Sequence, residues 1–241
     1  MEASRYPTTE SRNSRWIAPG WHLLLILLLV LGFAALAALG AHLHGLTPHP
    51  QRQGLALGYL FAMTVEWVMV AVVWLGIRLR KVSLRNLVGG RWESGRAVLR
   101  DLGIVALFFV ASNLVSAVLT QFLKVDAGRA VRDLLPHSEV EVALYLMMAL
   151  TAGICEEIVF RGYLQRQFTA LTGNAGAAVV AQGILFAVFH GNQGLKFMAI
   201  VGVYGCLLGA LAWWRRSLRP GMIAHFLQDG LVGVLAPYLF K

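Results

Sequence analysis

Long runs of apolar residues divide the chain into segments. Seven runs are about 18 residues or longer, and they lie at about 21–42, 54–78, 102–123, 139–164, 174–191, 197–214 and 220–239. An α-helix rises about 1.5 Å per residue, so a run of this length can cross a hydrocarbon core of roughly 30 Å. The runs are continuously apolar, whereas barrel strands alternate over about ten residues. The pattern therefore predicts an all-α, polytopic membrane helix bundle of about seven transmembrane helices.

The composition supports a membrane protein. Hydrophobic residues make up 58% of the 241 residues and charged residues only 14%, against roughly 25% charged in soluble proteins. The longest polar stretch between apolar runs is the basic segment 78–101, which we expect at the membrane surface. No stretch is long enough for a separate soluble domain, so we expect a single membrane domain over residues 1–241.

The first apolar run raises the question of a cleaved signal peptide. It follows Arg12 and Arg15 and ends in small residues, as a signal peptide would. Its length exceeds that of a typical signal core and favours a retained membrane anchor.

The basic residues predict how the chain is oriented. If the N-terminus is cytoplasmic, the inner segments hold fifteen Lys and Arg residues and the outer segments six, as the positive-inside rule requires. We therefore expect residues 1–20 to form a cytoplasmic tail and Lys241 to lie outside. The net charge of +9 comes from residues beside helix ends rather than from a separate basic domain, so we expect the lipid bilayer, and no nucleic acid, as the partner. The fifteen inner residues are Arg5, Arg12, Arg15, Arg78, Arg80, Lys81, Arg85, Arg91, Arg96, Arg100, Arg161, Arg166, Arg215, Arg216 and Arg219.

A few ionisable residues interrupt the apolar runs. Each costs on the order of 3 kcal/mol at the middle of a bilayer, so each needs a partner or a function. Glu66 stands alone in the second run, and its simplest role is a hydrogen bond or ion pair that ties that helix into the bundle. The others occur in the later runs: Glu156, Glu157, His190, His225 and Asp229.

The two adjacent glutamates point in different directions. Neighbouring helical residues are about 100° apart, so Glu156 and Glu157 should have different roles. Glu157 has Arg161 four residues further on, which is the favourable spacing for an ion pair. Glu156 shares its face with small residues, among them Gly153, which predicts space for a water molecule and a substrate.

Helix depth indicates which residues can meet. Glu156 and His190 each lie 16 residues from the ends of the turn at Gly173, or about 24 Å along straight antiparallel helices, so the two side chains should lie at one level. His225 lies only about 8 Å from the turn before its own helix. A shared site therefore requires either a long projection of the turn at Gly173 or an irregular helix. Asp229 shares a helical face with His225 at a spacing of four residues.

Three short motifs together resemble a known family. EEIVFR, FAVFH and HFLQD follow the order EExxxR, FxxxH and HxxxN/D of the CAAX-protease and bacteriocin-processing (CPBP, or Abi) family of intramembrane peptidases. The resemblance covers about residues 139–235, which would form the catalytic core. It implies a metal-independent, glutamate-type endopeptidase in which Glu156 and His190 activate a water molecule.

The resemblance also assigns the remaining motif residues. It implies that His225 and Asp229 stabilise the oxyanion, and that Glu157, Arg161 and Phe186 shape the site. The last motif position is commonly Asn in this family and is Asp229 here. An ionised carboxylate has no hydrogen to donate to an oxyanion. Asp229 either stays protonated through burial or orients His225.

Other functions remain open from the sequence. One carboxylate and two histidines could form an open zinc site, although the chain has no HExxH motif. A non-catalytic membrane scaffold, immunity factor or accessory protein could use the same polar residues for packing. A secondary transporter is disfavoured because no inverted repeat is visible. The compact size, short loops and Arg-rich inner segments are typical of a prokaryotic plasma-membrane protein, and we expect a membrane-associated peptide or protein substrate.

Overall fold

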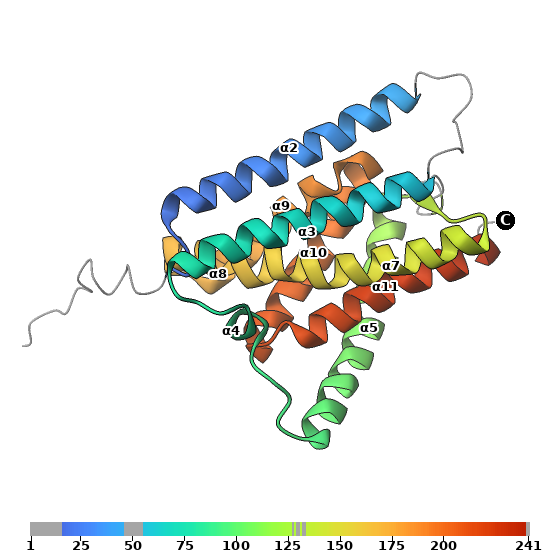
Figure 1. The fold of residues 1–241 in the computed structure, drawn as a ribbon. Coiled ribbons are helices and arrows are strands. Elements are labelled where there is room, and N and C mark those ends of the chain that lie inside the picture. The colour runs from blue at the N-terminus through green and yellow to red at the C-terminus, as the bar shows by residue number, and fades with distance from the viewer. Residues whose placement is uncertain (1–15, 46–54, 127, 129–130, 132–133, 240–241) are drawn as a thin grey trace, which may run out of the picture.

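The regular structure of the chain is helical wherever it is described (Figure 1). The computed structural model describes residues 16–45, 55–126, 128, 131 and 134–239; most of the predicted tail 1–20 lies outside these residues. The long helices are α2 (Gly20–Gly45), α3 (Leu55–Leu79), α5 (Gly95–Leu123), α7 (Glu139–Glu156), α9 (Ala175–Phe189), α10 (Leu195–Arg215) and α11 (Arg219–Leu239). The short elements are α4 (Leu84–Val88), η2 (Glu157–Leu164), α8 (Gln165–Thr172) and η3 (Gly191–Gln193).

The prediction of an all-α membrane bundle is confirmed, and a helix lies at each of the seven predicted runs. In the described part of the chain, five helical segments are long and apolar enough to cross a membrane. The helix α9 is apolar but shorter, and α11 is not one of the five. The five segments are Gly20–Leu43, Leu55–Leu79, Gly95–Leu123, Glu139–Thr172 and Leu195–Arg215.

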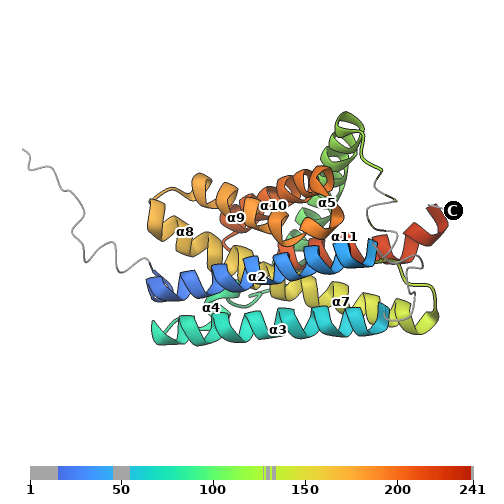
Figure 2. The ribbon, with the colours of Figure 1, turned by 90° about the horizontal axis from the view of Figure 1, so that it is seen from above.

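The helices pack around the middle of the longest helical segment. α7 packs against α3 and α11, while α9 packs against α8 and α10. Figures 1 and 2 show α2 and α3 running alongside this core, and α5 crossing the other helices at a steep angle. The largest fully buried side chains are Arg161, Tyr163 and Phe160, all in η2. The core is therefore centred on the segment that directly follows Glu156.

η2 is a π-helix, so the predicted straight helix 139–164 is irregular. All eight of its residues are buried, and such wide turns often occur at functional sites. The helix then continues as α8 to Gly173, whose left-handed φ of 71° ends it. At about 1.5 Å per residue, the 34 residues of Glu139–Thr172 exceed a hydrocarbon core of roughly 30 Å. Figure 1 shows the turn between α8 and α9 extending beyond the start of α11, so both of the conditions that would let Glu156 and His225 share one level are met.

The small residues near the motifs are used for close helix packing. A Cβ on Gly153 would lie 2.9 Å from the backbone oxygen of Met222 in α11. A Cβ on Gly183 would lie 3.1 Å from the oxygen of Gly202 in α10. The open space that we expected at Gly153 beside Glu156 is therefore filled by α11, because the missing side chain lets the two backbones approach.

α2 is joined to the core by buried polar contacts. The His22 Nε2 lies 3.0 Å from the carbonyl oxygen of Val72, which can only accept, so Nε2 carries the hydrogen in the neutral ring. Nδ1 then accepts a hydrogen bond from the Tyr163 hydroxyl at 2.7 Å. Gly76 leaves room for this ring, since a Cβ there would clash with it. Gln167 accepts hydrogen bonds from the backbone nitrogens before α2 and donates one to Ala18 O at 3.1 Å.

Candidate active site

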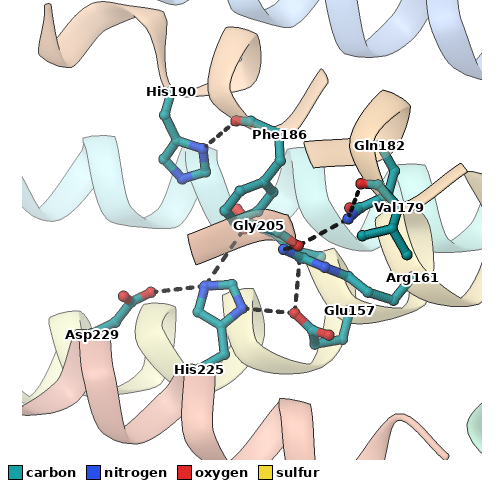
Figure 3. Close-up of polar contacts among 10 residues, drawn as sticks. Glu157, Arg161, Val179, Gln182, Phe186, His190, Gly205, His225 and Asp229 are labelled. Atoms are coloured by element: carbon teal, nitrogen blue, oxygen red, sulfur yellow. Dashed lines mark hydrogen bonds and ion pairs between the residues drawn. The ribbon is translucent and has the colours of Figure 1, made fainter. Parts of the chain in front are cut away.

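The irregular helix and its neighbours bring the motif residues into one cluster (Figure 3). They come from four separate elements and from the residue that follows α9. Glu156 ends α7, Glu157 begins η2, and Arg161 lies one turn further on; Phe186 lies near the end of α9, His190 directly follows it, and His225 and Asp229 lie in α11.

Glu157 connects two other residues of the cluster, Arg161 and His225. Its Oε1 lies 2.9 Å from Arg161 Nη1 and 3.2 Å from His225 Nδ1. The side chains of Glu157 and Arg161 are fully buried, so the predicted ion pair is present and shielded from solvent. Its Oε2 faces Gly221, where a Cβ would be 2.9 Å away. Gly221 lies in the first turn of α11, where the helix dipole stabilises a negative charge.

Phe186 is packed between the charged and imidazole groups. The guanidinium carbon of Arg161 lies over its ring at 4.2 Å from the centroid, a cation–π contact. On the α9 side, the His190 ring centroid is 4.6 Å away, and that of His225 is 5.8 Å away. Phe186 therefore fixes the spacing between the two histidines.

His190 has one ring nitrogen engaged and one available. Its Nδ1 lies 2.9 Å from the carbonyl oxygen of Phe186. A carbonyl only accepts, so Nδ1 donates, and the neutral ring presents an unprotonated Nε2. No hydrogen bond to Nε2 occurs among the described residues. A histidine held in this tautomer can accept a proton or a hydrogen bond from water.

Glu156 is a buried carboxylate with an unused oxygen. It is 4% exposed, and its Oε2 has no hydrogen-bond partner in the described part of the chain. The Nε2 of His225 lies 3.7 Å from Glu156 Oε2, which is too long for a hydrogen bond. Buried polar atoms are normally hydrogen-bonded, so an unpaired one needs an explanation, such as a water molecule or a catalytic role.

His225 lies between acidic groups. Its Nδ1 faces Glu157, and its Nε2 lies 3.4 Å from Asp229 Oδ2 (Figure 3). The Asp229 side chain is 37% exposed, whereas His225 is buried. The predicted spacing of His225 and Asp229 therefore brings the two groups into contact, and Asp229 lies at the more open edge of the cluster.

Glu66 is a further buried carboxylate, on a helix that packs against α7. It lies on α3, is 6% exposed, and has an Oε2 without a hydrogen-bond partner among the described residues. The charged groups that act on it most are Glu156 and His225. The sequence contained a signal, a lone buried carboxylate, but no spacing rule connects it to motifs on later helices.

The zinc alternative concerns the acidic and imidazole groups of this cluster. In the described part of the chain, no three His, Cys, Asp or Glu side chains form a group that could hold a metal ion.

Comparison with known proteins gives one match. The family model described as Rce1-like, "Type II CAAX prenyl endopeptidase Rce1-like", matches residues 138–231. No curated protein and no solved structure matches. The matched range contains all three motifs and excludes α2, α3 and α5.

Proposed function

Residues 138–231 belong to the Rce1-like family of type II CAAX prenyl endopeptidases, a CPBP family, and from this premise we propose that the chain is a glutamate-type intramembrane endopeptidase. Membership makes the protein a protease with a peptide or protein substrate. The catalytic residues and the absence of a metal are our proposal. Glu156 and His190 would activate water, and His225 would assist on the opposite side.

The observation that supports this proposal most is the free oxygen of Glu156. A carboxylate that is 4% exposed and lacks a hydrogen bond on Oε2 is a costly arrangement for structure alone. It is also a suitable acceptor for a water proton, because a carboxylate in a low-dielectric pocket gains basicity.

The proposed reaction begins with water between Glu156 and His190. Glu156 takes one water proton while the unprotonated Nε2 of His190 accepts a hydrogen bond from the other, and the water oxygen attacks the peptide carbonyl. The tetrahedral intermediate collapses when the proton held by Glu156 passes to the leaving nitrogen. One water molecule is consumed and two peptides are released, so atoms and charges balance.

The surrounding residues hold this arrangement in place. Glu157 accepts from His225 Nδ1 at 3.2 Å and fixes the direction of that ring. Arg161 compensates the Glu157 charge at 2.9 Å and also donates to the carbonyl of Gly205 in α10 at 3.2 Å. In this proposal these residues are positioning groups, because they orient His225 and connect η2 to the neighbouring helices.

The family match and the membrane setting suggest which substrates to test first. The matched family is described as acting on CAAX prenyl substrates, so a prenylated C-terminal peptide is the first class to test. The long apolar helices also suit other membrane-associated peptides. We place the protein in a prokaryotic plasma membrane with a cytoplasmic N-terminus, as the distribution of basic residues suggests.

A comparison of membrane peptide profiles tests the proposal. Cells producing wild-type protein and cells producing Glu156→Gln at equal levels would be compared by mass spectrometry. The proposal predicts peptides that appear only with the wild type. An identical profile, with a variant that is folded and inserted, would instead support the non-catalytic scaffold.

A further inference from the structure

The proposed reaction, on which this inference rests, needs a hydrogen-bond donor for the oxyanion. As water attacks, the carbonyl oxygen becomes negatively charged, and neutral or positive donors must face it. The family resemblance places this role on His225 and Asp229. The structure directs both ring nitrogens of His225 toward carboxylates, Nδ1 at Glu157 and Nε2 at Asp229. Asp229 has a carboxylate where the motif commonly has an amide donor, so the site needs another donor.

Tyr204 on α10 is a candidate for this additional hydrogen-bond donor. Its ring meets that of His225 edge to face, at 6.0 Å between centroids and 78° between planes. The same helix supplies the Gly205 carbonyl that accepts a hydrogen bond from Arg161 at 3.2 Å. Tyr204 therefore lies on a helix that contacts the cluster, with its ring beside the imidazole of His225.

The Tyr204 hydroxyl is available for a hydrogen bond. In the described chain no hydrogen bond engages it, whereas the Tyr59 hydroxyl donates to Leu134 O at 2.6 Å and the Tyr163 hydroxyl pairs with His22 at 2.7 Å. Tyr145 is the other tyrosine near Asp229, but its ring packs edge-on against Tyr59, 5.5 Å away. No ring contact joins Tyr145 to His225 among the described residues.

We propose that Tyr204 is a catalytic residue of this site and that its phenolic hydroxyl donates a hydrogen bond to the oxyanion of the tetrahedral intermediate. A phenol keeps its hydrogen well above neutral pH and is a good donor. Its rigid ring, held by His225 on one face and by Phe108 of α5 at 6.2 Å, needs no reorientation during the reaction. Asp229 then serves as the group that orients His225, at 3.4 Å.

Tyr204→Phe tests this role because it removes only the hydroxyl. Loss of one oxyanion donor typically lowers kcat by about 10² to 10³, and we expect a loss in that range with KM and thermal stability unchanged. Tyr145→Phe is the matched control, since it removes a hydroxyl near the same carboxylate without touching His225. A Tyr204→Phe enzyme with kcat within about threefold of wild type, or a kcat loss confined to Tyr145→Phe, would overturn the proposal.

Binding of a charged analogue separates the donor from a structural effect. A phosphinate peptide presents a negatively charged oxygen where the tetrahedral intermediate has one, so Tyr204→Phe should weaken its binding by at least about tenfold while substrate binding is kept. Equal binding of the phosphinate to both proteins contradicts the role of Tyr204. If Glu156→Gln cleaves as fast as the wild type, the proposed function itself is wrong; if Glu156→Gln is inactive and Tyr204→Phe is not, only the inference about Tyr204 fails.

Discussion

His225 Nδ1 lies 3.2 Å from Glu157 Oε1, and the same oxygen lies 2.9 Å from Arg161 Nη1. One carboxylate therefore both compensates a buried guanidinium and fixes the direction of an imidazole on another helix. This connection explains why two adjacent glutamates can have separate tasks. The Oε1 of Glu157 makes both of these contacts, whereas the Oε2 of Glu156 lies 3.7 Å from His225 Nε2 and makes no hydrogen bond among the described residues.

Glu157→Gln should destabilise the fold strongly. The change keeps the side-chain shape but leaves Arg161 buried without a counter-charge, and breaking a buried ion pair typically costs about 3–5 kcal/mol. Unfolding in detergent with increasing denaturant measures the loss. Glu93→Gln, at an exposed position, is the control and should unfold as the wild type does. Equal stability of the two variants would show that the Glu157–Arg161 pair contributes little.

Tyr163→Phe should separate stability from catalysis. The variant loses the hydrogen bond to His22 Nδ1, which joins α2 to η2, and a typical net contribution is about 1 kcal/mol. The ring contact with His22, at 5.4 Å, is kept. We expect a slightly lower unfolding temperature and unchanged kcat and KM. A large loss of kcat without a loss of stability would mean that this contact takes part in the reaction.

Glu66→Gln tests how the carboxylate on α3 contributes. The side chain is 6% exposed, and its Oε2 has no hydrogen-bond partner in the described part of the chain, so an ionised carboxylate at this position would be destabilising. A neutral amide of the same shape should therefore leave the free energy of unfolding unchanged or raise it. If Glu66 ties α3 into the bundle, as the sequence alone suggested, the variant will be less stable than the wild type.

Metal removal should not affect the reaction. In the proposed mechanism Glu156 and His190 act on water without a Lewis acid. Purified protein treated with a strong chelator should keep its kcat, and metal analysis should find less than one zinc ion per chain. Activity that is lost on chelation and restored by added zinc would support the zinc peptidase alternative.

The helices could be predicted from the sequence because the length of an apolar run determines whether it can form a membrane-spanning helix. Each of the seven apolar runs contains a helix, and within the described residues five helical segments are long and apolar enough to cross a membrane. The Glu157–Arg161 pair was predictable as well, since it depends on local helical spacing. Local periodicity thus determined the elements and the contacts within one helix.

The contacts between helices could not be predicted from the sequence to the same extent. The π-helix of Glu157–Leu164 has no simple sequence signal, so the relative depth of His225 could not be settled by counting residues. Gly153 was interpreted as open space, but a small residue permits either a cavity or close packing, and only the position of α11 decides between them. The position of Glu66 depends on how α3 packs against α7, and the sequence of neither segment specifies that packing by itself.

The turnover of Glu156→Gln on a substrate peptide is the most direct test of the central claim. Wild-type protein and variant would be reconstituted in liposomes, shown to be equally folded, and compared on a peptide that the wild type cleaves. Loss of a general base typically lowers the rate by about 10² to 10⁴, so kcat should fall within this range while KM changes little. A Glu156→Gln protein that retains kcat to within about tenfold would contradict the role of Glu156 as the residue that activates water.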